Sequence, residues 1–366
     1  MGILTTLAVG GALALAVGAG AIPVIIRIAN RNGWFDLPNG RKVHTSPLPR
    51  LGGAGMYTGL LVSILAASAI SLLAGWGEAS GFGRELLLVQ AGFLVIFATG
   101  LVDDFRNLAA PLKFFLQVVA GGLVALGGFT IETLALPGFP AVHLGWVAWP
   151  VTVLWLVSLS NAMNLVDGVD GFAGAIAATA ALALGASAFL QGRYGAALIA
   201  VCLLGVVVAF LLFNFPPARI FMGDSGSLLL GFVLATLPLL RGSSNPDGAT
   251  LFLDLAATVA VLALPVLDTL TAIARRLRAG LPIHQPDKLH LHHKLQALGL
   301  SDRTLFLIAL ATGILLGATA LAAVLLGGWT GWVLLAAAAA VLCVLYVIVR
   351  YAAIPRMAAS RPARSR

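Results

Sequence analysis

Long apolar runs alternate with short polar segments along almost the whole chain. A helix needs about 20 apolar residues to cross a hydrocarbon core of about 30 Å, and many of the runs reach that length. The runs predict helices, because backbone groups in lipid must be satisfied internally and the alternating pattern of a β-barrel is missing. The predicted spans, eleven in all, lie near residues 3–26, 54–74, 86–102, 114–130, 147–163, 171–190, 194–212, 226–240, 250–274, 305–326 and 331–349.

Composition supports an all-α polytopic membrane protein, because 60% of the 366 residues are hydrophobic, 10% are charged and the mean hydropathy is +1.01. Of the 22 lysines and arginines, all but Arg84, Arg193 and Arg241 fall on one side of the predicted bundle. Cytosolic loops retain such residues during insertion. The N-terminus is therefore predicted outside and the C-terminus in the cytosol, with the protein in the inner (cytoplasmic) membrane.

We predict one transmembrane catalytic domain, 1–349, followed by a basic and disordered cytosolic tail, 350–366. The net charge of +8 is mostly a property of the inner face, so it suits anionic lipid headgroups and anionic substrates rather than nucleic acid. Cys202 and Cys343 fall inside predicted spans, which argues against a disulfide framework or a thiolate metal site. Segment 131–146 is predicted to form a small hairpin or a re-entrant piece on the outer face.

Carboxylates gather where apolar runs end, and the first such block is LVDDFRNL at 101–108. On a helix Asp103 and Asn107 would share a face, with Asp104 beside them. Two adjacent carboxylates at a membrane edge cost energy unless a cation, a lysine or a shared proton compensates. Lys113 is the candidate lysine. The alternative is a solvated helix cap and loop.

The second block, NAMNLVDGVDG at 161–171, ends the fifth predicted span. Its amide and acid side chains are those of Asn161, Asn164, Asp167 and Asp170. Such oxygens suit a hard cation or sugar hydroxyls, and the glycines between them permit close approach of the backbone to a ligand. The alternative is a plain turn between two spans.

The third block, NFPPARIFMGDSGSL, begins at Asn214 and leads into the eighth predicted span. Gly223, Gly226 and Ser227 around Asp224 are typical of a helix start that cradles phosphate with free N–H groups. This segment is a weak signal when taken alone. Its value comes from sharing the inner face with two other acidic blocks.

Two basic loops also lie on the predicted inner face. His290, His292 and His293 stand in PDKLHLHHKL, where no nearby cysteine or glutamate completes a zinc site, so contacts to phosphate and sugar are preferred over an incidental basic loop. The loop GRKVHTSPLPRLGG at 40–53 could clamp a nucleotide diphosphate or serve only as a positive-inside signal. Its polar side chains are those of Arg41, Lys42, His44 and Arg50.

Taken in this order, the motifs resemble those of the polyprenyl-phosphate N-acetylhexosamine-1-phosphate transferases, from about residue 30 to residue 300. This family contains the N-acetylglucosaminyl-1-phosphate enzymes and the phospho-muramoyl-pentapeptide translocase. The resemblance implies Mg²⁺-dependent transfer of a sugar phosphate from a UDP-N-acetylhexosamine to undecaprenyl phosphate, with Mn²⁺ able to substitute and UMP released. The HLHH form looks more like the N-acetylglucosamine branch.

The resemblance also implies roles for individual residues. Asp224 would be the metal ligand with Asp103 and Asp104 beside it, and Phe221 would stack on uracil. The catalytic candidates are Asp103, Asp104, Asp167, Asp224, His290, His292 and His293. The substrate-binding candidates are Lys42, His44, Arg50, Asn107, Asn161, Asn164, Asp170, Asn214 and Phe221.

Two other classes of protein remain open at this point. A transporter or scramblase would place polar groups near the bilayer midplane on broken helices, whereas these acids lie at one face and no inverted repeat is visible. An assembly scaffold would tolerate loss of Asp224. A homodimer is left open. Asp268, inside the ninth predicted span, is interpreted as a structural brace for Arg275, with contact to substrate as the alternative.

Overall fold

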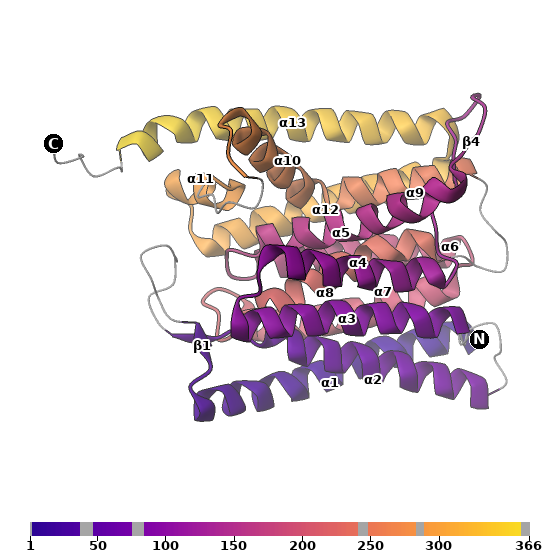
Figure 1. The fold of residues 1–366 in the computed structure, drawn as a ribbon, viewed down its shortest axis with the longest axis horizontal. Coiled ribbons are helices and arrows are strands. Elements are labelled where there is room, and N and C mark those ends of the chain that lie inside the picture. Colours follow the sequence, from indigo (N-terminus) through magenta and orange to yellow (C-terminus); the bar gives the residue numbers. More distant parts are fainter. Residues whose placement is uncertain (1, 37–46, 75–83, 241–247, 283–288, 360–366) are drawn as a thin grey trace.

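The computed structural model describes residues 2–36, 47–74, 84–240, 248–282 and 289–359 (Figure 1). The helices are α1 (Gly2–Asn32), α2 (Gly52–Leu73), α3 (Arg84–Arg106), α4 (Ala110–Leu126), α5 (Ala148–Val166), α6 (Phe172–Leu190), α7 (Tyr194–Asn214), α8 (Gly223–Thr236), α9 (Gly248–Val261), α10 (Ala263–Arg278), α11 (Leu291–Ala297), α12 (Asp302–Leu326) and α13 (Gly328–Ala359). Short 3₁₀ turns occupy η2 (Gly145–Val147) and η3 (Leu237–Leu239). The strands are β1 (Phe35–Asp36), β2 (Leu48–Pro49), β3 (Thr133–Leu134) and β4 (Val142–His143), paired antiparallel as β1–β2 and β3–β4.

Each predicted span contains a helix, so the all-α polytopic membrane class is confirmed. By length and composition, 8 of the helices in the described residues could cross a membrane, or up to 9 if one bent pair is a single span. Two further apolar helices are shorter than these candidate spans. They are Ala110–Leu126, which is α4, and Gly223–Leu239, which is α8 continued by η3. The number of candidate spans in the described residues is therefore smaller than the eleven that the hydrophobic runs predicted.

The ninth predicted span, 250–274, is not a straight helix. α9 and α10 meet at a bend of 79°. Pro265 lies in the first turn of α10, where a missing N–H is tolerated, but it could not continue a straight helix because its ring would clash with the preceding turn. α10 also carries Arg275, Arg276 and Arg278 in its last turn, which suits water or headgroups rather than hydrocarbon.

The centre of the bundle consists of α6, α7 and α8, whose residues are largely buried. α8 packs between α3 and α5, and Ser160 of α5 donates a hydrogen bond to the carbonyl of Leu228 (2.8 Å). α3 approaches the first turn of α8 at Gly100, where a Cβ atom would lie 2.4 Å from the carbonyl oxygen of Asp224. This close contact brings the ends of α3 and α8 together.

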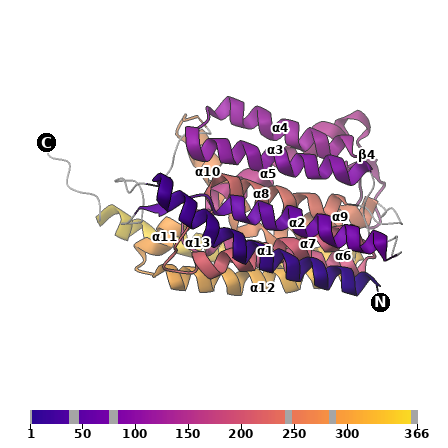
Figure 2. The ribbon, with the colours of Figure 1, turned by 90° about the horizontal axis from the view of Figure 1, so that it is seen from below.

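Different elements lie at the two ends of the bundle. The N-terminus lies at one end with the β3–β4 pair, and α11, β1 and the C-terminal end of α13 lie at the other (Figure 1). The view from below shows the same separation along the bundle (Figure 2). The predicted hairpin is confirmed by the pairing of Thr133 with His143. α13 continues to Ala359, so residues 350–359 of the segment predicted as a disordered tail are helical.

Candidate active site

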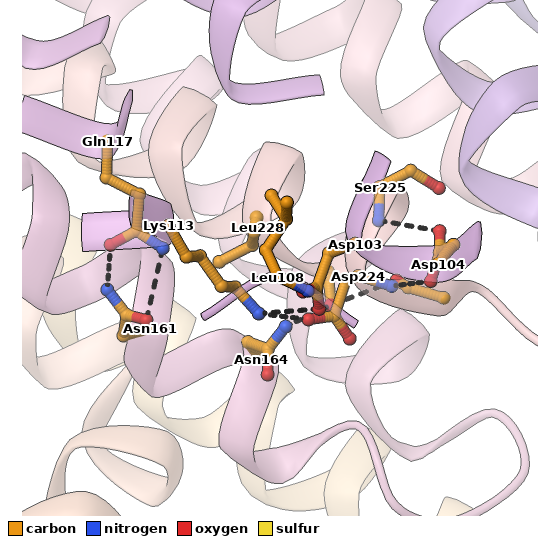
Figure 3. Close-up of polar contacts among 12 residues, drawn as sticks. Asp103, Asp104, Leu108, Lys113, Gln117, Asn161, Asn164, Asp224, Ser225 and Leu228 are labelled. Atoms are coloured by element: carbon orange, nitrogen blue, oxygen red, sulfur yellow. Dashed lines mark hydrogen bonds and ion pairs between the residues drawn. The ribbon is translucent and has the colours of Figure 1, made fainter. Parts of the chain in front are cut away.

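Asp104, in the last turn of α3, holds the start of α8. Its two carboxylate oxygens accept hydrogen bonds from the backbone N–H groups of Asp224 (2.8 Å) and Ser225 (3.1 Å), as Figure 3 shows. The Arg50 guanidinium donates from Nε to the backbone carbonyl of Asp104 (3.0 Å). The side chain of Asp104 therefore satisfies two N–H groups that a helix leaves without partners at its first turn.

Lys113 of α4 lies between two carboxylates. Its ammonium is 3.1 Å from Asp103 Oδ2 and also pairs with Asp224 Oδ2 (Figure 3). Asp103 Oδ1 accepts a further hydrogen bond from the backbone N–H of Leu108 (2.6 Å). Lys113 is a partner of Asp103, as predicted, but its ammonium joins Asp103 to Asp224 of α8 rather than to the neighbouring Asp104.

A pair of amides ties α4 to α5 one helical turn after Lys113. Asn161 Nδ2 donates to Gln117 Oε1 (2.7 Å), and Gln117 Nε2 donates back to Asn161 Oδ1 (3.3 Å). Asn164, one turn closer to the acids, donates to Ser227 Oγ (3.2 Å). Sequence reasoning missed Gln117, although its position one helical turn after Lys113 could have indicated it.

The second and third motifs are joined through their loops. Asn214 accepts from the Gly171 N–H (2.7 Å) and donates to the Ile220 carbonyl (2.7 Å). Asp170 accepts from the Ala218 N–H (2.8 Å). The basic loop at 40–53 contacts the third motif through its backbone. The N–H of Phe221 donates to the carbonyl of Pro49, and the N–H of Gly52 donates to the carbonyl of Phe221.

One cavity of about 360 Å³ collects side chains from these motifs. Its lining consists of Arg50, Asp104, Asn164, Asp167, Gly168, Val169, Asp170, Asn214, Phe221, Gly223, Asp224, Ser227, His292, His293, Gln296 and Asp302. Segments that are far apart in the chain, from Arg50 to Asp302, therefore meet around one space. Gln296 and Asp302 were not among the predicted candidates, and Gln296 donates to Asp302 Oδ1 (3.0 Å).

Some predicted residues lie behind the cavity or outside the described chain. Asp103 reaches the lining residue Asp224 through Lys113, and Asn161 pairs with Gln117 outside the lining. Asn107 does not continue the helical face of Asp103, because α3 ends at Arg106 and Asn107 has φ 49°, a left-handed conformation that asparagine tolerates. Predictions for Arg41, Lys42 and His44 fall outside the described residues.

His290 also lies behind the cavity, and its contact corrects the interpretation of Asp268. His290 Nδ1 is 2.7 Å from Asp268 Oδ2, and the N–H of Leu291 donates to Asp268 Oδ1 (2.8 Å). Arg275 was the partner predicted for Asp268. Both oxygens of Asp268 contact the segment at His290 and Leu291, and Arg275 lies two turns, roughly 10 Å, further along α10.

Two titratable groups outside the spans, Asp167 and His292, have displaced pKa values. Burial, followed by the negative charges of Asp224 and Asp104, raises the pKa of Asp167 to about 7. Burial, followed by the charge of His293, lowers the pKa of His292 to about 3. At neutral pH, His292 is neutral and Asp167 is protonated in part of the molecules, so Asp167 can donate a hydrogen bond to a substrate oxygen.

Lowering the pH from about 7.5 to about 5.5 is expected to destabilise the protein through His292. Its pKa is about 3 in the fold against an ordinary 6.5, so the stability it contributes is present above pH 6.5 and is lost as the pH falls toward 3. Within that window, each pH unit lowers the free energy of unfolding by about 1.4 kcal/mol. Melting temperatures in detergent measure the effect.

A variant with His292→Gln should show a smaller melting-temperature drop between the two pH values than the unchanged protein. His143→Gln, on the exposed β4 strand, is the control and should keep the full drop. An equal drop in His292→Gln would contradict the assignment of this pH dependence to His292.

The acidic residues were also tested for their fit to a divalent cation. Within the part of the chain that the structure describes, no group of three or more His, Cys, Asp or Glu side chains is arranged to hold a metal ion. Of the three predicted metal ligands, Asp104 is held by backbone N–H groups at both oxygens, whereas Asp103 and Asp224 share the ammonium of Lys113 and Asp224 lines the cavity. Mg²⁺ is commonly held by one or two carboxylates with water and substrate phosphate, so this smaller set fits it.

Comparisons with known proteins give a consistent result. The family model described as glycosyl transferase family 4 matches residues 86–241, which include all three acidic motifs. A probable undecaprenyl-phosphate N-acetylglucosaminyl 1-phosphate transferase of Bacillus subtilis strain 168 is 32% identical over 302 residues, covering 82% of this chain and 80% of that protein.

Two other relatives extend the comparison. The decaprenyl-phosphate N-acetylglucosaminephosphotransferase of Mycolicibacterium smegmatis is 36% identical over 307 residues, covering 79% of this chain and 75% of the relative. A phospho-N-acetylmuramoyl-pentapeptide-transferase of Streptococcus equi subsp. zooepidemicus is 35% identical over 248 residues, covering 62% of this chain and 70% of the relative. The family match at 86–241 includes α3, α5, α7 and α8, each of which contributes a residue to the cavity lining.

Proposed function

This chain belongs to the polyprenyl-phosphate N-acetylhexosamine-1-phosphate transferases of glycosyl transferase family 4, and we propose that it transfers N-acetylglucosamine 1-phosphate from UDP-N-acetylglucosamine to undecaprenyl phosphate. UMP is the second product. Relatives named for N-acetylglucosamine support this donor, since they cover more of the chain than the muramoyl-pentapeptide relative does. The lipid product would begin a cell-envelope polysaccharide.

The observation that carries this proposal is the meeting of acids, amides and histidines in one cavity at one end of a membrane bundle. The acceptor has a very apolar tail and the donor is very polar, so their phosphates can meet only near the headgroup level. A polar cavity at the end of the spans offers such a place. The helices around it are apolar enough to keep the lipid tail in the bilayer.

The reaction exchanges one pyrophosphate bond for another. A phosphate oxygen of the lipid attacks the β-phosphorus of the UDP-sugar, the bond from that phosphorus to the bridging oxygen breaks, and the electron pair leaves with UMP. A phosphate monoester has a second pKa near 6, so the acceptor is largely dianionic at neutral pH. Catalysis must then come from positioning and charge neutralisation more than from proton abstraction.

The side chains of the cavity divide this work with Asp103 and Lys113, which lie behind its lining and pair with Asp224. Asp103, held by Lys113, orients the lipid phosphate, and His292 and His293 contact the donor pyrophosphate. Phe221 stacks on the uracil ring, as the family resemblance implies. Asp104 keeps the first turn of α8 in place. Lys113 offsets part of the charge that accumulates when donor and acceptor phosphates approach each other.

Asp224 and Asp103 are the residues that would hold Mg²⁺. When bound, this ion neutralises charge on phosphate oxygens. We propose direct attack by the lipid phosphate rather than a covalent aspartyl phosphate. Incubation with UDP-sugar alone should leave the protein without phosphate, and a phosphorylated aspartate trapped in that experiment would contradict direct attack.

The orientation in the inner membrane is also part of the proposal, with the cavity on the cytosolic side. The distribution of lysines and arginines supports it. With Cys202 and Cys343 replaced, an impermeant thiol reagent added to intact cells should label Phe139→Cys near β4 and not Ser301→Cys before α12. The reverse labelling would contradict this orientation.

The donor is tested with purified protein, undecaprenyl phosphate, Mg²⁺ and a panel of UDP-sugars, with the lipid product identified by mass. UDP-N-acetylglucosamine should give a lipid heavier by one N-acetylglucosamine phosphate and should react faster than UDP-N-acetylgalactosamine or UDP-glucose. Faster reaction with UDP-N-acetylmuramoyl-pentapeptide would instead assign the chain to the other branch of the family.

A further inference from the structure

α11 is a short helix whose position depends on its surroundings. It spans Leu291–Ala297, and helices of this length are not stable in isolation. One side carries His292, His293 and Gln296 into the cavity lining. Its other side is buried, and Lys294 there is only 5% exposed. Contacts on that buried side must therefore decide where the two histidines lie.

The first of these contacts comes from α10. Asp268 is fully buried, and its two oxygens contact His290 Nδ1 (2.7 Å) and the N–H of Leu291 (2.8 Å). A carboxylate oxygen only accepts, so it favours the tautomer in which His290 Nδ1 carries the proton. The pair fixes both the ring of His290 and the first residue of α11.

The second contact comes from α13. Lys294 donates from Nζ to the hydroxyl of Tyr346 (2.8 Å), and its ammonium lies 4.8 Å from the centre of that ring. The same hydroxyl is 2.6 Å from Thr271 Oγ1 on α10. Tyr346 thus joins α10, α11 and α13 at one point, one helical turn beyond the contact of Asp268.

We propose that Asp268 and Tyr346 are positioning residues of the transfer reaction, which hold α11 so that His292 and His293 face the donor pyrophosphate. This inference rests on the proposed function, because it assigns those histidines to the donor. Neither Asp268 nor Tyr346 lines the cavity, so each acts through α11. Partners that orient a functional histidine commonly change activity by about 10–100-fold when they are removed.

A double-mutant cycle separates positioning from simple stabilisation. Asp268→Asn keeps the size of the side chain but places either an amide N–H or a weaker acceptor against His290. It is expected to lower kcat/KM for UDP-N-acetylglucosamine by about 10–100-fold. In a protein that already carries His292→Gln and His293→Gln, the same change should have less than about a twofold further effect, because coupled residues are not additive.

Equal losses in the two backgrounds would overturn the proposal, since they would mean that Asp268 acts independently of the histidines. Tyr346→Phe provides a second variant that removes one hydroxyl and leaves the ring in place. It should lower kcat/KM by a smaller factor, about 3- to 10-fold, and this loss should also vanish in the background without the two histidines. A loss that persists there would equally reject the role of Tyr346.

Asp254→Asn is the matched control. Asp254 is a buried carboxylate of α9, 3% exposed, and pairs with Arg193 at 3.0 Å; neither residue belongs to the cavity lining. Its replacement should lower the melting temperature without lowering kcat/KM. A loss of kcat/KM equal to that of Asp268→Asn would mean that general loosening explains both. If the unchanged protein forms no lipid product from any UDP-sugar, the proposed function fails instead.

Discussion

Asp224→Asn is expected to lower kcat by about 1000-fold. Asp224 begins α8, lines the cavity and shares Lys113 with Asp103. Asparagine keeps the shape of the side chain and one oxygen for Lys113, but it removes the negative charge that would hold Mg²⁺. The rate of lipid product formation at saturating UDP-N-acetylglucosamine measures the loss.

Folding and nucleotide binding should survive this substitution. The melting temperature should change by only a few degrees, because Asp104 still caps α8, and the affinity for UMP should stay within about threefold. Asp302→Asn makes the same charge change in the same lining, away from Lys113, and should cost far less turnover. Similar losses for the two variants would contradict a specific role for Asp224.

Gly223→Ala is expected to damage both the fold and the activity, with turnover reduced by more than about 100-fold. Gly223 has φ 71°, where an alanine costs about 1–2 kcal/mol. Its Cβ would also lie 2.3 Å from the Arg50 carbonyl oxygen and 2.6 Å from Asp104 Oδ2. The start of α8 must therefore move away from the carboxylate that caps it. Melting temperature and turnover are measured together.

Gly192→Ala separates backbone strain from this collision. Gly192 has φ 72°, nearly the same conformation, but a Cβ atom there would meet nothing within 4 Å. This variant should lose about 1 kcal/mol of stability from strain alone and keep its turnover. If Gly223→Ala behaved like Gly192→Ala, the close packing of Asp104 against α8 would not matter for the reaction.

The sequence predicted the membrane class and the meeting of the motifs for the same physical reason. Carboxylates avoid hydrocarbon, so acids at the ends of several apolar runs can be accommodated together at one end of a bundle. Asp104, Asp167 and Asp224 do line one cavity, together with His292 and His293. Lys113 was predictable as well, because an acidic pair at that position needs a cation.

Other features depended on contacts that no local pattern encodes. The capping of α8 by Asp104 joins residues about 120 positions apart in the chain, and the pairing of Asp268 with His290 requires the bend between α9 and α10. Hydropathy averaged over a window of span length hides that bend, although Pro265 marks its place. Gln296 and Asp302 follow the histidine motif, but no sequence pattern marks them as cavity residues. The packing of α11 beside α12 is what brings them to the lining.

The central claim is that the β-phosphate of the donor moves with the sugar. The most direct measurement uses UDP-N-acetylglucosamine carrying separate labels in the sugar and the β-phosphate, with purified protein, undecaprenyl phosphate and Mg²⁺. Both labels should enter the organic phase in equal amounts, with UMP left in water. Entry of the sugar label alone with release of UDP, or retention of both labels in water, would contradict the account.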